Sequence, residues 1–214
     1  MSLTLNSFIL LIISIFGGTF TIWRDIEKKY AFTVLSYPIS RASYLLQRFF
    51  AVVIVLFFIN VVNLLIGLIV IKFSSTIYKS DLPLLLDHIV VAYFFSLFKY
   101  ILILAFAFLF SSIATSFYVP IFLTISVYII GNASQGLYDF VSKEGDKFNI
   151  IIKKVINFIY YTFPNLSSFD FTAHASYSLP YEPSILLKTF IYFILYLGIV
   201  ILCTILMINR RDFT

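Results

Sequence analysis

The sequence is poor in the residue types on which most enzyme chemistry depends. Its one cysteine, Cys203, excludes a disulfide within the chain, and with only two histidines a metal site is not expected. The motifs G-x-x-x-x-G-K-[ST], G-x-S-x-G and H-E-x-x-H are all absent. The chain is therefore not expected to be an enzyme. We also do not expect it to hydrolyse ATP through a phosphate-binding loop of its own, or to hold a resident cofactor.

Charged residues are also scarce, at 12% of the chain, which is about half of their share in soluble domains. Apolar residues make up 61%, and the mean hydropathy is +1.02. This composition predicts a single all-α membrane domain over 1–214. No basic groove interleaved with aromatic residues indicates nucleic-acid binding. Five apolar runs approach the ~20 residues that a helix needs to cross a bilayer. These runs are 3–23, 49–71, 89–110, 117–137 and 184–208.

Basic residues gather in two connecting regions. The segment 24–48 contains five Lys or Arg, and the tail adds Arg210 and Arg211. An even number of predicted spans separates these two regions, so both lie on one side of the bilayer. Because short basic loops stay inside, we expect this side to be cytoplasmic. The sequence thus predicts a multi-pass protein of the cytoplasmic (inner) membrane with a cytoplasmic C-terminus.

The segment 24–48 also carries local structural signals. Arg24, Glu27 and Lys28 have the spacing of one helix face, so the first span should continue beyond the membrane. Pro38 should break that helix, and Ser40 can cap the next one. The expected result is a short helix on the membrane surface. It is either the contact site of a cytosolic partner or a connecting loop that basic residues anchor without a partner.

The segment 138–183 is too long for an idle connection. Its apolar residues between 148 and 159 recur at helical spacing, with Lys153 and Lys154 opposite. This pattern predicts an amphipathic helix at the outer membrane surface, which Pro164 and Asn165 should end.

Polar residues inside the predicted spans have more than one interpretation. Lys99, in the middle of the third span, lines a pathway, contacts another subunit, or is a structural lysine that neighbouring hydroxyls satisfy. Asn132, Asn60 and Asn63 are best explained by hydrogen bonds between helices. His88 and His174 fall in separate outer segments and have no identifiable nucleophile as a partner.

Four motifs resemble segments of the permease subunits of ABC-2-type transporters, in the multi-copper-enzyme-maturation and gliding-type subfamily. The first leads from Trp-Arg-Asp-Ile-Glu-Lys at 23–28 to Leu-Ser-Tyr-Pro-Ile-Ser-Arg at 35–41. The others are Tyr-Ile-Ile-Gly-Asn-Ala-Ser-Gln at 128–135, Phe-Pro-Asn-Leu-Ser-Ser-Phe-Asp at 163–170 and Arg-Arg-Asp-Phe at 210–213. Their order and spacing fit the whole chain, although the family usually has six spans rather than five.

The resemblance implies that the segment 24–48 is a coupling helix on a separate ATP-binding-cassette ATPase, which would hold ATP and magnesium. It also implies a second permease chain and an outer gate region over 138–183 that includes Pro164, Asn165 and Phe169. Independently of the resemblance, their polarity inside the predicted spans makes Lys99 and Asn132 candidates for lining a pathway or contacting a subunit. The implied ATPase contacts are Arg24, Asp25, Glu27, Lys28, Tyr37, Pro38, Ile39, Ser40 and Arg41.

Two alternatives differ in class from a transport subunit. One is a membrane scaffold or assembly protein that binds partners in the lipid bilayer without moving cargo. The other is an intramembrane enzyme, which is disfavoured because no acidic residue lies inside a predicted span.

Overall fold

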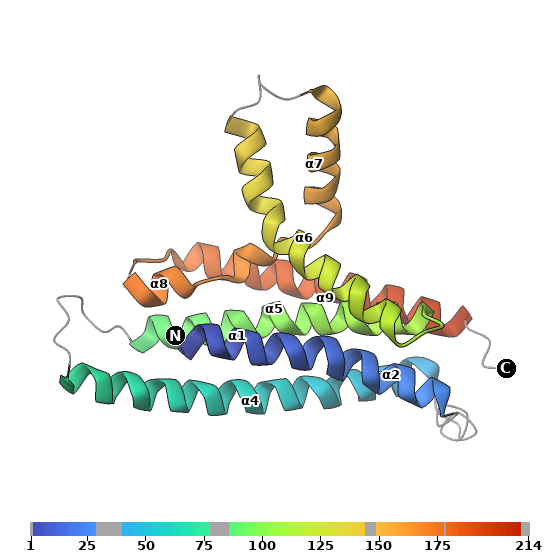
Figure 1. Cartoon of the computed structure of the whole chain (residues 1–214), viewed down its shortest axis with the longest axis horizontal. Helices are drawn as coiled ribbons and strands as arrows, with labels where there is room; N and C mark the ends of the chain where they lie inside the picture. The colour runs from blue at the N-terminus through green and yellow to red at the C-terminus, as the bar shows by residue number, and fades with distance from the viewer. Residues whose placement is uncertain (1, 29–39, 78–85, 144–148, 178, 211–214) are drawn as a thin grey trace.

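The computed structural model describes residues 2–28, 40–77, 86–143, 149–177 and 179–210, and these residues contain helices and no strand. The long helices lie side by side in a bundle whose axis is horizontal in Figure 1. The helices are α1 (Ser2–Ile12), the π-helical η1 (Ile13–Gly17), α2 (Gly18–Glu27), α4 (Arg41–Ile77), α5 (Leu86–Ile113), α6 (Tyr118–Lys143), α7 (Ile150–Thr162), the 3-10 helix η3 (Leu166–Phe169), α8 (Thr172–Tyr177) and α9 (Pro183–Arg210).

Five helical segments in the described ranges are long and apolar enough to cross a membrane, one for each predicted span. They are Ser2–Asp25, Arg41–Phe73, Leu86–Ile113, Tyr118–Lys143 and Pro183–Arg210. The predicted fold class, an all-α bundle of membrane-spanning helices, is confirmed. The chain has the architecture of a multi-pass membrane protein.

The second span begins where the sequence predicts a helix cap. The Ser40 hydroxyl oxygen accepts a hydrogen bond from the Ser43 backbone N–H at 3.1 Å, and α4 starts at Arg41. The capped helix is the span itself, since α4 runs unbroken from Arg41 to Ile77. The predicted break at Pro38 lies outside the described residues.

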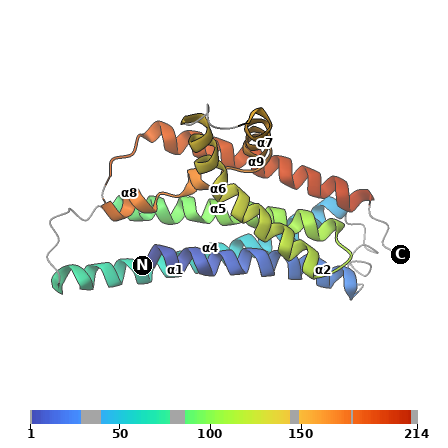
Figure 2. The same ribbon diagram turned by 45° about the horizontal axis from the view of Figure 1, so that its top comes forward.

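The third span, α5, is the centre of the bundle. Its most apolar stretch is 72% buried, against 39% or less for the other four spans. Figure 2 shows α5 between the α1, α2 and α4 side and the α9 side. Helix α2 approaches α5 closely at Gly18, where an added Cβ would lie 2.7 Å from the Cβ of Ala107. Small residues allow such close contact between membrane helices. Helix association in lipid depends on van der Waals packing, because the hydrophobic effect does not favour contact with another helix over contact with lipid tails.

Asparagine side chains join the first two spans. Asn6 Nδ2 donates to Asn60 Oδ1 at 2.9 Å, and Asn63 Nδ2 donates to Asn6 Oδ1 at 3.0 Å. The predicted hydrogen bonding between helices is thus present for Asn60 and Asn63. Asn132 differs, because its Nδ2 donates to the Tyr128 carbonyl oxygen of its own helix at 2.7 Å.

Helices α6 and α7 form a hairpin that stands out from the bundle (Figure 1). The predicted amphipathic helix is α7, and the Asn149 side chain caps its start by accepting a hydrogen bond from the Ile151 backbone N–H. None of its side chains is buried, and it runs across the bundle axis.

Candidate functional site

The ends of the predicted partner-binding segment meet at one end of the bundle. Helix α2 ends, α4 begins and α9 ends there (right in Figure 1), and we call it the Arg210 end. The predicted contact residues Tyr37, Pro38 and Ile39 lie outside the described residues, whereas the residues on both sides of them are described.

Asp25 joins α2 to α4 through a buried ion pair. Its side chain is 2% exposed, and its Oδ2 lies 2.8 Å from an Arg48 guanidinium nitrogen. The Tyr44 hydroxyl donates to the same oxygen at 2.6 Å. A buried carboxylate is costly unless it is paired and hydrogen-bonded. Asp25, which the resemblance assigns to a partner contact, therefore points into the bundle and fixes the end of α2 against the first turns of α4.

Arg41 joins the start of α4 to the end of α9. One of its guanidinium nitrogens donates to the carbonyl oxygens of Ile208 at 3.2 Å and Asn209 at 3.1 Å. The last carbonyls of a helix have no partner within it, and they carry the negative end of its dipole. A cation at this position satisfies both requirements, and it couples the position of α4 to that of α9.

The charges that remain accessible at the end of α2 are those of Glu27 and Lys28. Both side chains are exposed, whereas the Arg24 guanidinium lies over the Phe20 ring at 4.9 Å. Beside Ser40, the first turns of α4 border an open hollow of about 630 Å³ that Phe50 also lines. Exposed charges and an open hollow thus flank the segment 29–39.

The second candidate region is the chain between α7 and α8, residues 163–171, which we call the re-entrant segment. Pro164 is buried, and Phe169 is fully buried with 0% exposure. An added Cβ at Gly131, near the middle of α6, would lie 2.7 Å from the Pro164 carbonyl oxygen. The Tyr196 hydroxyl, halfway along α9, donates to the Thr162 carbonyl oxygen at 2.8 Å. The segment therefore reaches the middle of the bundle.

Side chains of α6 and α9 satisfy the backbone and side chains of this segment. The Tyr192 hydroxyl oxygen accepts from the Asn165 backbone N–H at 2.9 Å. Gln135 Oε1 accepts from Asn165 Nδ2 at 2.6 Å and from the Tyr160 hydroxyl at 3.2 Å. Non-helical backbone is tolerated at membrane depth only where it is buried in protein or lines an aqueous cavity. These hydrogen bonds are what make the re-entrant segment possible.

Lys99 lies beneath the same segment. Its side chain is buried, with 7% exposure, and its ammonium nitrogen lies 5.7 Å from the centre of the Tyr128 ring. The carboxylate of Asp170, which directly follows η3, is near enough to attract this ammonium group electrostatically. Asp170 itself caps the start of α8, since its Oδ1 accepts from the Thr172 N–H at 3.0 Å. The re-entrant segment thus supplies a negative charge near the Lys99 ammonium group. Asn132 makes no such contact with this segment in the described hydrogen bonds, since its side chain bonds within its own helix.

Several of these residues were not among the predicted site residues. Tyr192 and Tyr196 lie one turn apart in the last apolar span, a spacing that could have identified a polar stripe on α9. The structure also brings the two histidines together, with His88 Nδ1 3.4 Å from the His174 carbonyl oxygen.

No protein-family model matches the sequence, and no curated protein matches it at a significant level.

Proposed function

We propose that the chain is the membrane-spanning permease subunit of an ATP-binding-cassette transporter, which moves a substrate with ATP that a separate subunit hydrolyses. The observation that carries the proposal is the anchoring of the segment 24–48. Asp25 and Arg48 fix one side of it, Arg41 ties the other side to α9, and Glu27 and Lys28 remain exposed beside it. A partner that displaces a segment held in this way would move α4 and α9 together.

The distribution of charge supports the orientation that this function needs. Arg24, Lys28, Arg41, Arg48 and Arg210 all lie at the Arg210 end. By the positive-inside rule this end faces the cytoplasm, which is where an ATPase carrying ATP and magnesium would bind. We place the chain in the cytoplasmic membrane with a cytoplasmic C-terminus.

The re-entrant segment fits the role of an outer gate. It connects α7 to α8 and reaches the middle of the bundle from the opposite side. Movement of α9, to which Arg41 is attached, would displace Tyr192 and Tyr196 and with them the hydrogen bonds to Asn165 and Thr162. ATPase binding would in this way shift the population between two arrangements of the bundle. A second permease chain would complete the pathway.

Affinity purification of the full chain from its native membranes tests the proposal. We expect an ABC ATPase to copurify. Lys28→Glu and Glu27→Lys should reduce its recovery, because both side chains are exposed beside the docking segment. Lys154→Glu, on α7 at a distance from the Arg210 end, makes the same charge change as Lys28→Glu and should leave the recovery unchanged.

Arg41→Gln separates docking from coupling. It should retain the copurified ATPase but lower the ATP turnover of the complex, since the link to the α9 carbonyl oxygens is lost. Recovery of no ATPase from native membranes would contradict the proposal. Recovery that charge reversal at positions 27 and 28 leaves intact would contradict the docking assignment.

A further inference from the structure

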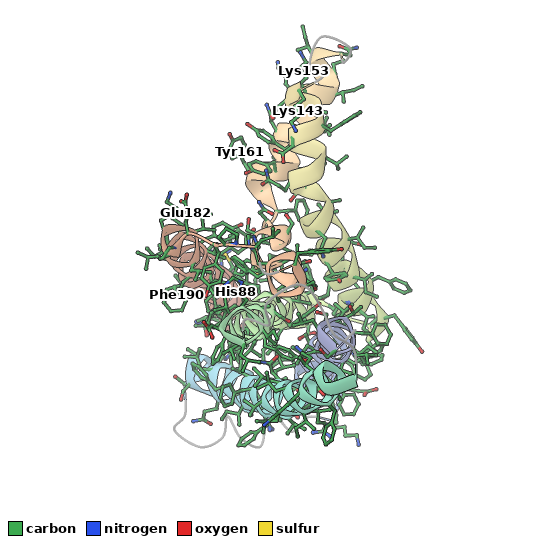
Figure 3. The ribbon with its side chains drawn as sticks, turned by 90° about the vertical axis from the view of Figure 1, so that its left-hand side faces the viewer. His88, Lys143, Lys153, Tyr161, Glu182 and Phe190 are labelled. Carbon is green, nitrogen blue, oxygen red and sulfur yellow. The ribbon has the colours of Figure 1, made fainter. Side chains whose placement is uncertain are left out.

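A cavity of about 450 Å³ lies where α7 and the re-entrant segment meet α9. Its walls are mainly aromatic. Its lining includes Tyr160, Tyr161, Phe163, Lys188, Tyr192 and Tyr196. In Figure 3, Tyr161 lies on the side of the projecting hairpin that faces α9, whereas Lys143 and Lys153 lie toward its far end. One side of the cavity is therefore formed by the hairpin, and the other side is formed by α9.

The cavity extends along α9 from Lys188 toward Tyr196. Helix α9 has 28 residues, and Tyr196 is at its midpoint. Lys188 precedes Tyr196 by eight residues, which is about 12 Å along a helix. Half of the hydrocarbon core is about 15 Å thick, so with the midpoint of α9 placed at the centre of the bilayer, the Lys188 ammonium group reaches the phosphate layer by snorkelling. The tyrosine rings then lie at the depth of acyl chains.

The lining offers hydrogen-bond donors to an anion at the Lys188 side. The Tyr192 hydroxyl oxygen accepts from the Asn165 N–H, which leaves its own hydrogen to donate. Lys188 is exposed and brings a positive charge. Among the described residues that line the cavity, none is acidic. A negatively charged group therefore finds a complementary site at this side of the cavity.

Apolar surface continues from the cavity along the same face of α9. Leu195 is 63% exposed and Ile199 is 60% exposed, at seven and eleven residues after Lys188. These spacings place both on the Lys188 face of the helix. A free phosphate would contact neither this apolar surface nor the aromatic walls of the cavity. A molecule with an anionic head and an apolar tail can contact Lys188, the aromatic walls and the apolar surface of α9 together.

We propose that this cavity binds an anionic phospholipid. Its phosphate contacts Lys188 and the Tyr192 hydroxyl, and an acyl chain lies against the tyrosine rings and along Leu195 and Ile199. The proposal does not depend on the proposed transport function, because lipid binding needs no ATPase.

Quenching of a tryptophan in the cavity by brominated lipid tests the proposal. Trp23 is the only tryptophan of the chain, so Trp23→Phe with Tyr161→Trp gives a single reporter. The full chain is reconstituted in vesicles of phosphatidylcholine, to which dibrominated phosphatidylglycerol or dibrominated phosphatidylcholine is added. Since one lysine near the surface favours an anionic lipid, we expect a preference of about fivefold for phosphatidylglycerol.

Lys188→Gln should abolish this preference, and Lys188→Arg should retain it. Lys153→Gln makes the same charge change far from the cavity (Figure 3) and should leave the preference intact. The proposal is overturned if the reporter shows no preference, if Lys188→Gln preserves it, or if Lys153→Gln removes it equally. Relief of quenching by soluble glycerol 3-phosphate would also overturn it, because the site would then take the anion without the lipid.

Discussion

Removing Arg48 should destabilise the bundle mainly by leaving Asp25 unpaired. Breaking a fully buried ion pair costs about 3–5 kcal/mol, because a charge remains without compensation. The Arg48 side chain is 38% exposed, so water already stabilises part of the pair. For Arg48→Met we therefore expect a loss of about 2 kcal/mol in the free energy of unfolding, or about 30-fold in the unfolding equilibrium.

The double variant Asp25→Asn with Arg48→Met distinguishes the cause. Its neutral amide can still accept the hydrogen bond from Tyr44, and no buried charge is left. We expect the double variant to lose only about 1 kcal/mol, so that it is more stable than Arg48→Met alone. A simple loss of contacts would instead make the double variant the less stable of the two.

Titration of mixed micelles with dodecyl sulfate measures these differences through Trp23. Its ring centre lies 5.2 Å from that of Phe117, so the fluorescence of this single tryptophan reports separation of α2 from the start of α6. Lys154→Met removes an exposed lysine on α7 and should change stability by less than about 0.5 kcal/mol. Equal stability of Arg48→Met and the unaltered protein would refute the reasoning, as would a double variant less stable than Arg48→Met.

Two further substitutions probe the inside of the bundle. Gly131→Val should displace the re-entrant segment, because the new side chain meets the Pro164 carbonyl oxygen. The rate of backbone hydrogen exchange at 163–169 should therefore rise. Gly136→Val is the control, since the space around its Cβ is open. Comparable exchange in the two variants would contradict the close approach. Asn6→Leu should lose about 0.6–2 kcal/mol in the dodecyl sulfate titration, since it removes both hydrogen bonds to α4. A more stable Asn6→Leu variant would show that these bonds contribute nothing net.

The sequence predicted the helices well because their signals are local. Each span is a continuous apolar run, and Ser40 is a cap that its neighbour Ser43 completes. The helix that Ser40 caps was predicted to continue into the second span, and α4 does so from Arg41. The contacts of its first turns with Asp25 and α9 were not predicted, because they join residues far apart in the sequence.

The candidate site was less accessible from the sequence because it depends on distant residues. The motif around Asn165 was visible, but its burial depends on Gln135 and Tyr192, 30 and 27 positions away. The same holds for Asp25, whose inward direction is set by Arg48 rather than by its own helix. No local pattern encodes either pairing.

The π-helical turn η1 also determines which way the polar residues of the first span face. Asn6 and Asp25 both contact α4, yet they are 19 residues apart in α1–η1–α2. In an uninterrupted α-helix, 19 residues would rotate the two side chains about 100° out of alignment, whereas 18 would complete five turns. A π turn absorbs one additional residue. The π turn therefore restores the alignment of the two side chains. As a result, the Asn6 amide near one end of the first span and the Asp25 carboxylate near the other end both face α4.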